Sequence, residues 1–207
     1  MSEFFSEANA SSSKPGKSIH QFQAELAAII GNPTDLRPFI CNGSPLTCRV
    51  FIVGLNPASP MQSGFWDFWQ PGVGFDKQSW MQAYMTERAQ RPLKPGRTRR
   101  KKISNTRTVI ESIIGELGPN DCLETNIYAK ATEEYTDLEQ ADRATASFDY
   151  LLETIKPQIL IAHGKDAVAH VKGKSVDAHI LDRSHFGRGW SQDSARELGR
   201  TVRQLLK

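Results

Sequence analysis

Four polar side chains stand at or just past the ends of the four segments that the sequence predicts as strands. The strands are expected at residues 49–54, 122–128, 158–163 and 177–181, and the side chains are Asn56, Asn126, His163 and His185. The loops that follow the strands of an open parallel sheet meet at one edge, where ligands bind. Taken singly, each residue could be a turn amide or a capping histidine. Together, two amides and two imidazoles without a carboxylate nucleophile suit recognition of a flat, polar, neutral group such as a nucleobase.

Several common chemistries are excluded by spacing. The Gly-Lys-Ser stretches at Gly16 and Gly173 both lack the first glycine of a phosphate-binding loop. His163 and His170 are seven residues apart, which does not place both on one helix face for zinc. The G-x-S-x-G pattern of serine hydrolases is absent, and no G-x-G-x-x-G follows the first strand. We therefore expect neither a metal nor a cofactor.

The elements that must position these side chains alternate between strand and helix. Such alternation implies parallel crossovers, with helices on both faces of one sheet. The sequence thus predicts a three-layer α/β/α sandwich with a central, mostly parallel four-stranded sheet. Residues 1–18 are small, polar and turn-rich, so we expect a disordered tail followed by a single domain at residues 19–207. Helices are expected at residues 19–30, 77–89, 104–117, 138–155, 166–171 and 193–206.

Composition indicates a globular protein of ordinary size. The chain has 207 residues, of which 39% are hydrophobic and 24% charged, which excludes disorder throughout and a fibrous fold. No apolar run approaches the roughly 18 residues of a membrane span, and the first 17 residues lack the apolar core of a signal peptide. The cysteines, Cys41, Cys48 and Cys122, fit neither a disulfide framework nor a C-x-x-C metal pair. We expect a cytoplasmic protein with reduced, buried thiols.

The positive charge is concentrated in one segment. Nine of the 26 Lys and Arg residues lie between Arg88 and Arg107, with no acidic residue among them. We call residues 88–107 the basic window. The rest of the chain has 17 basic residues against 23 acidic ones and is therefore mildly acidic. A polyanion partner is one interpretation and a solvated loop is the other.

Three segments resemble motifs of the uracil-DNA glycosylase superfamily. FIVGLNPAS, at residues 51–59, resembles its first motif, especially the G-x-N-P core of the mismatch-specific and single-strand-selective branches. ETNIYAK, at 124–130, resembles the middle strand whose Asn reads the base, and SHFGRGW, at 184–190, stands where the family has a His-containing loop that enters DNA. The order of these three segments along the chain fits that superfamily, and the resemblance covers about three quarters of the chain. Two departures are Phe186, where Pro commonly follows the His, and the long insertion before Ser104.

The resemblance implies a role for each matching residue. Asn56 would hold the water that attacks the sugar C1′, and His185 would donate a hydrogen bond to the departing base oxygen. Asn126 would pair with the O4 and N3–H edge of uracil. Leu55 is placed with the base-binding residues, together with Phe65 or Phe68 as the stacking platform.

The resemblance also implies DNA as the partner, with a damaged base flipped into the site of a monomeric protein. Phe186 would act as an apolar wedge and Arg188 would meet phosphate. Two alternatives stay open: a non-catalytic nucleic-acid-binding member of the same fold, and an enzyme acting on a nucleoside or nucleotide. The residues expected to contact DNA are Ser59, Arg97, Arg99, Arg100, Lys101, Lys102, Ser184, Phe186, Arg188 and Trp190.

Overall fold

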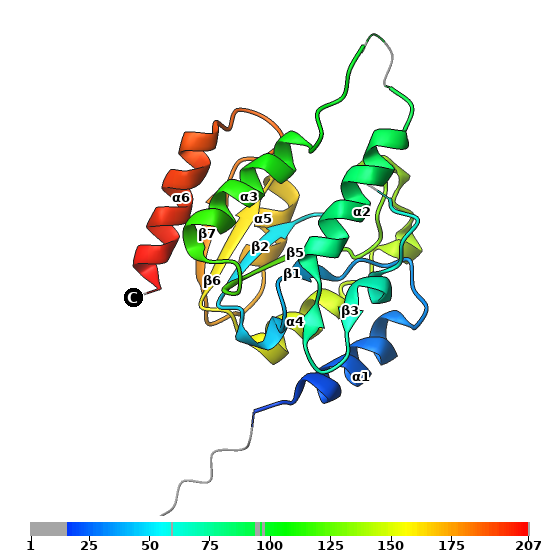
Figure 1. Cartoon of the computed structure of the whole chain (residues 1–207). Helices are drawn as coiled ribbons and strands as arrows, with labels where there is room; N and C mark the ends of the chain where they lie inside the picture. Colours follow the sequence, from blue (N-terminus) through cyan, green and yellow to red (C-terminus); the bar gives the residue numbers. More distant parts are fainter. Residues whose placement is uncertain (1–15, 59, 94–95, 97, 207) are drawn as a thin grey trace, which may run out of the picture.

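The centre of the fold is a five-stranded sheet in which four neighbouring strands run parallel (Figure 1). The computed structural model describes residues 16–58, 60–93, 96 and 98–206, so most of the expected tail lies outside the described residues. The strand order is β1-β5-β2-β6-β7, with β1 antiparallel to β5 at one edge. The strands are β1 (Phe39–Cys41), β2 (Val50–Gly54), β5 (Cys122–Asn126), β6 (Ile159–His163) and β7 (His179–Arg183).

The prediction of a mostly parallel sheet between helices is confirmed, but the count of four strands was wrong. The additional strand is β1, which pairs with β5 through Phe39 opposite Thr125 and Cys41 opposite Leu123. Three residues are too few to show an alternating pattern, and Pro38 directly before them indicates a loop. Antiparallel pairing at the edge leaves the carboxyl ends of the four parallel strands together on one side.

Helices cover both faces of the sheet (Figure 1). Helices α3 and α6 pack on one face, and α1, α4 and α5 pack on the other. Helix α2 stands beside α3 and is joined to it by the basic window. The helices are α1 (Ile19–Ile30), α2 (Lys77–Gln90), α3 (Asn105–Leu117), α4 (Ala146–Ile155), α5 (Lys165–Lys172) and α6 (Gln192–Leu205).

Two hydrophobic cores hold the layers together because successive side chains of a strand point to opposite faces. Along β2, Val50 and Ile52 join the core under α3 and α6, whereas Phe51 and Val53 join the core under α1, α4 and α5. All five residues of β2 are buried, as a central parallel strand requires. The rigid centre of the sheet therefore supports the loop that begins at Gly54.

Helix α4 begins eight residues later than the predicted start at residue 138. Its apolar stripe, formed by Phe148, Leu151 and Leu152, begins only after Thr145. The segment before it contains two single-turn 3₁₀ helices, at Tyr135–Asp137 and Gln140–Asp142. Of residues 138–145 only Leu138 is buried, so a longer α-helix would gain little from packing.

The three cysteines are free and buried, as expected. Burial raises the pKa of the Cys122 thiol well above its ordinary value. Among the described residues, no helix has the length and apolar character of a membrane span. The same part of the chain contains no group of three or more His, Cys, Asp or Glu side chains that could hold a metal ion.

Candidate active site at the carboxyl edge of the sheet

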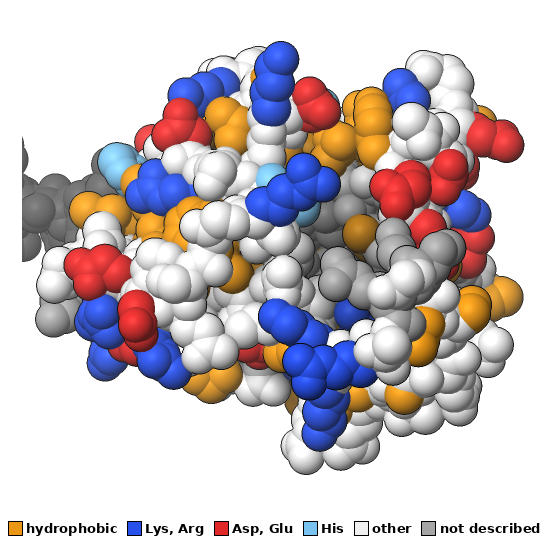
Figure 2. Space-filling view, turned by 90° about the horizontal axis from the view of Figure 1, so that it is seen from above, with side chains coloured by type: hydrophobic (Ala, Val, Ile, Leu, Met, Phe, Trp, Pro, Cys, Tyr) orange, Lys and Arg blue, Asp and Glu red, His pale blue; other side chains and the backbone are white. Residues whose placement is uncertain are grey.

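A cavity of about 570 Å³ lies at the carboxyl edge of the sheet, and we call it the inner cavity. The cavity is lined by Leu55 and by four polar residues from the ends of four different strands, Asn56, Asn126, His163 and His185. A second, outer cavity of about 1130 Å³ adjoins it, and the two share five lining residues. The face that is seen from above in Figure 2 is hollowed near its centre, with Lys and Arg side chains beside the hollow.

The amide of Asn56 is held in one orientation. Its Nδ2 donates to the Oγ1 of Thr132 at 2.7 Å, and that hydroxyl donates to the carbonyl of Glu134 at 2.7 Å. The backbone N–H of Thr132 also donates to the carbonyl of Pro57 at 3.0 Å, which ties the two loops together. Within the described chain no hydrogen bond reaches Asn56 Oδ1. The side chain therefore presents an acceptor, and Thr132 is a site residue that the sequence reasoning missed.

Gly54 makes room for two polar side chains above the end of β2. A Cβ added at Gly54 would lie 2.6 Å from Oδ1 of Asn126 and 3.3 Å from Nε2 of His163. Asn126 approaches from the end of β5 and His163 from the end of β6, the two strands that flank β2. The absence of a side chain at Gly54 thus allows an amide and an imidazole to approach each other over the floor of the cavity.

His163 is a buried, neutral histidine. Its relative exposure is 7%, and its ring stacks on Phe186 with centroids 4.2 Å apart and planes at 16°. Its Nδ1 is buried and has no hydrogen-bond partner among the described residues. Burial, with a smaller effect of His185, lowers the pKa of His163 to about 3. The ring therefore carries no charge near neutral pH.

His185 is held by the loop that follows it. The backbone N–H of Gly187 donates to Nδ1 of His185 at 3.1 Å, so Nδ1 is an acceptor and the neutral ring carries its proton on Nε2. A Cβ at Gly187 would lie only 2.9 Å from that nitrogen. Gly164 packs against the ring in the left-handed backbone region, at φ +87°, and a Cβ there would lie 3.4 Å from the ring. His185 can thus donate one hydrogen bond from Nε2.

One wall of the inner cavity is built on a buried group of charges. Arg107 donates to both carboxylate oxygens of Glu124, at 2.6 and 2.5 Å, and to Glu111 at 3.2 Å. Lys77 lies 3.0 Å from Glu111 and 3.6 Å from Glu124. The guanidinium of Arg107 also lies over Trp80, 4.7 Å from the ring centroid. Burial lowers the pKa of Arg107, but the carboxylates of Glu124 and Glu111 outweigh it and raise that pKa above its usual range.

A second cation in the wall comes from the segment before β1. Arg37 lines the inner cavity, and burial lowers its pKa to about 10, with smaller contributions from the neighbouring guanidinium groups of Arg107 and Arg91. Arg37 therefore remains charged at neutral pH. The sequence contained no motif that indicated it, because its approach to the cavity depends on the pairing of β1 with β5.

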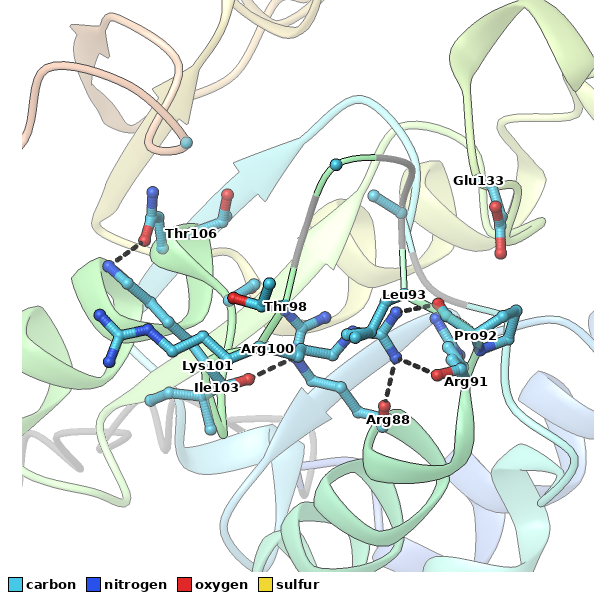
Figure 3. A pocket seen from close by; sticks show the side chains of 16 residues that line it. Arg88, Arg91, Pro92, Leu93, Thr98, Arg100, Lys101, Ile103, Thr106 and Glu133 are labelled. Carbon is cyan, nitrogen blue, oxygen red and sulfur yellow. Dashed lines mark hydrogen bonds between the residues drawn. The ribbon is translucent and has the colours of Figure 1, made fainter.

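The basic window lines the outer cavity, but part of its charge serves the loop itself (Figure 3). Arg100 donates to the carbonyls of Arg88 and Arg91, at 2.7 and 2.9 Å, and also to the carbonyl of Pro92. Arg88 in turn donates to the carbonyl of Lys101 at 3.2 Å. These bonds close the loop between α2 and α3 on itself, so Arg100 acts as an internal support.

The remaining predicted cations differ in position. Arg99 and Lys101 are exposed and line the outer cavity, where Lys101 also donates to Asn105 at 2.9 Å. Lys102 is exposed but does not line either cavity. Arg97 and Ser59 lie outside the described residues.

The expectation that Phe186 projects as a wedge was wrong. Its side chain is 1% exposed because it is packed between His163 and Trp190. Trp190 is half-buried, and its Nε1 donates to the Oγ of Ser184 at 3.1 Å. Ser184 and Arg188 are exposed, so the part of this loop available to a partner is polar.

The structure does not bring Phe65 or Phe68 to the inner cavity. Both are buried in the hydrophobic core instead. Other aromatic side chains line the cavity. Trp80 stacks on Tyr84 with centroids 5.4 Å apart, whereas Tyr135 is 41% exposed at the rim. Tyr135 is the accessible aromatic surface, and the sequence reasoning missed it because it stands in a short 3₁₀ turn.

No family model and no curated protein matches the chain. Function must therefore be argued from the cavity. The three segments that resemble glycosylase motifs contribute Asn56, Asn126 and His185 to this one cavity, although they lie far apart along the chain.

Proposed function

We propose that the protein is a monofunctional DNA glycosylase that hydrolyses the N-glycosidic bond of uracil or a related deaminated base and so initiates base excision repair. The observation that carries the proposal is the inner cavity, in which an oriented Asn56, Asn126 and His185 meet beside a cation-lined outer cavity. The proposal retains the monomeric, cytoplasmic protein that the sequence led us to expect.

Asn56 would hold the attacking water through Oδ1, the atom that its bond to Thr132 leaves as an acceptor. The water oxygen bonds to C1′ as the bond from C1′ to the base nitrogen breaks, and that electron pair leaves with the base. The water gives up one proton to solvent, and the base anion later takes one from solvent. Because an amide is no useful general base, the transition state must be dissociative, with an oxocarbenium-like sugar. His185 would stabilise the leaving base by donating from Nε2 to an oxygen on which charge develops.

Asn126 would read the base. An amide oxygen can accept from N3–H of uracil while the amide nitrogen donates to O4. Cytosine presents an amino group and an unprotonated N3 at those positions, so it cannot satisfy the same orientation of the amide. No hydrogen bond between the described residues engages the side-chain amide of Asn126, so it would be available for this contact.

The outer cavity would receive the DNA backbone. Arg99 and Lys101 are exposed there, whereas Arg100 is engaged by backbone carbonyls. We therefore assign phosphate contacts to Arg99 and Lys101, and we assign Arg100 the role of holding the loop between α2 and α3 in place. Binding that depends on such contacts weakens steeply as the salt concentration rises, because counterions must be released from the DNA.

Replacing Thr132 by Val should lower kcat about 10- to 100-fold while KM changes little. The substitution keeps the shape of the side chain but removes the hydroxyl that orients the Asn56 amide, and a small misplacement of a reacting group is costly. Single-turnover base release measures this effect. Thr132→Ser restores the hydroxyl and should recover most of the rate. Equal activity of the Val and Ser variants would show that Thr132 does not position Asn56.

Replacing Gly54 by Ala should reduce kcat/KM for uracil about 100-fold and weaken discrimination against cytosine. The added Cβ would overlap Oδ1 of Asn126, so the amide must turn away from its reading position. Gly115→Ala is the matched control, since it lies on α3 with nothing near the added methyl group. Unchanged base selectivity in Gly54→Ala would contradict the assignment of Asn126.

The test of the proposed function is release of base from labelled oligonucleotides. The substrates carry uracil opposite G, uracil opposite A, uracil in a single strand, hypoxanthine, or thymine opposite G. The expected result is release of uracil with formation of an abasic site. Salt-sensitive DNA binding without release from any substrate would support the non-catalytic alternative, which the burial of the expected wedge Phe186 favours. Turnover of free nucleosides without DNA affinity would support the third interpretation.

A further inference from the structure

His163 is a buried histidine that the proposed reaction does not yet use. It lines the inner cavity, and its Nε2 faces the space over Gly54 beside Asn126. Its Nδ1 lies in a buried position without a partner among the described residues. An orphaned N–H is rarer in protein interiors than an under-satisfied acceptor. The favoured neutral tautomer therefore leaves Nδ1 as a bare acceptor and places the proton on Nε2, toward the cavity.

The ring cannot easily turn away from this position. One face is covered by Phe186 at a centroid distance of 4.2 Å, and His185 approaches it edge-on at 5.5 Å. Along the sheet edge, His163 ends β6 and lies between Asn126 on the β5 side and His185 on the β7 side. The order of polar groups is therefore an amide followed by two imidazoles.

We propose that His163 is a second donor to the same base carbonyl that His185 contacts, so that the cavity selects bases whose edge reads carbonyl, N–H, carbonyl. Asn126 would satisfy the first carbonyl and the N–H, and the two imidazoles would donate to the two lone pairs of the second carbonyl. This inference rests on the proposed function and defines its substrate class. Paired donors aimed at an oxygen that gains charge stabilise the transition state more than the ground state.

The bases with this edge are uracil, thymine and, among the deaminated purines, xanthine, so the edge separates uracil from cytosine and hypoxanthine but not from thymine. Hypoxanthine has the first carbonyl and the N–H but only C–H in place of the second carbonyl, so both imidazole donors would lose their acceptor. His163 is only 7% exposed, so leaving its donor unpaired costs binding free energy and disfavours such a base, whereas the exposed His185 can donate to water instead. The inner cavity, at about 570 Å³, falls in the range of pockets that hold whole small molecules, so a two-ring base is not excluded by size.

The test compares three substrates with three proteins. Oligonucleotides carrying uracil, xanthine or hypoxanthine are treated with the wild-type protein, His163→Phe and His170→Phe under single-turnover conditions. Phe keeps an aromatic ring on Phe186 and removes the orphaned Nδ1, so the variant should fold. His170 is the matched control, because its Nε2 is also buried without a partner among the described residues but it packs on Phe148 outside the cavity.

The expected result is that the wild-type protein releases uracil and xanthine at least about ten-fold faster than hypoxanthine. In His163→Phe the rate of release of uracil and of xanthine should fall about ten-fold or more, and the rate for hypoxanthine should change little. His170→Phe should release the three bases at the wild-type rates. Equal release of uracil and hypoxanthine by the wild-type protein would overturn the inference, as would an unchanged pattern in His163→Phe. Both results leave the proposed function standing, whereas release of no base at all would remove the proposed function and this inference with it.

Discussion

Asn56→Ala should slow base release about 10²- to 10³-fold, because the attacking water loses the hydrogen-bond acceptor that positions it. The side chain lines the inner cavity, and its bond to Thr132 leaves Oδ1 to hold a water. Alanine removes this acceptor without adding bulk, so the base can still enter. DNA affinity should stay close to the wild-type value because the cationic outer cavity is untouched. Single-turnover release and equilibrium binding to the same uracil oligonucleotide separate these effects.

Asn56→Asp is the matched variant for this prediction. A carboxylate keeps an acceptor for the water, and the hydroxyl of Thr132 can turn to donate to it. It should therefore retain more activity than Asn56→Ala. Loss of the single hydrogen bond to Thr132 should cost the Ala variant only about 1 kcal/mol of unfolding free energy. Full activity of Asn56→Ala would remove the basis for the assignment.

Glu124→Gln should lower the free energy of unfolding by about 3–5 kcal/mol, the usual cost of removing one partner from a buried ion pair. Glu124 is 6% exposed and receives both hydrogen bonds at 2.5–2.6 Å from Arg107, while Lys77 lies 3.6 Å away. Gln has nearly the same shape, so the effect measures the charge rather than a void. The neutral amide leaves Arg107 and Lys77 with only the more exposed carboxylate of Glu111 to balance their charges. Urea unfolding followed by tryptophan fluorescence would measure the change.

Glu111→Gln is the control, since Glu111 contacts the same two cations. Its side chain is 31% exposed, so water screens the charges when its own is removed. We expect a loss within about 1 kcal/mol for this variant. Equal losses for the two variants would show that burial of Glu124 does not set the strength of the pair.

The strands and the convergence of polar residues could be predicted because both depend on local patterns and on topology. The β-branched run of β2 is buried on both faces, which leaves a continuous apolar signal in the sequence. Parallel crossovers then bring the carboxyl ends together without any knowledge of packing. Asn56, Asn126 and His185 were found in this way, and helix α1 was predicted with its observed bounds, residues 19–30.

What could not be predicted depends on contacts between distant residues. Thr132 reaches Asn56 across 76 residues, and no local pattern marks that bond. The residue type of an aromatic side chain does not show whether it is exposed or buried. Phe65, Phe68 and Phe186 were therefore assigned to ligand or DNA contacts, although packing places all three inside the protein. The position of Arg107 in the basic window also gave no sign that this residue forms a buried ion pair with Glu124.

The basic window illustrates the same limit for charge. From the sequence, the nine cations could form either a surface for a polyanion or a solvated loop. The structure divides them, because Arg100 and Arg88 donate to carbonyls of their own loop, whereas Arg99 and Lys101 remain exposed at the outer cavity. Net charge predicts attraction to a polyanion, but the hydrogen bonds decide which cations can reach it.

The measurement that tests the central claim most directly is the appearance of free uracil from a uracil-containing oligonucleotide mixed with an excess of the wild-type protein. We expect free uracil in step with abasic sites, one for one, and a rate that is about 10²- to 10³-fold lower in Asn56→Ala at equal DNA occupancy. Saturated DNA binding without any free base would contradict glycosylase activity and indicate a DNA-binding protein instead.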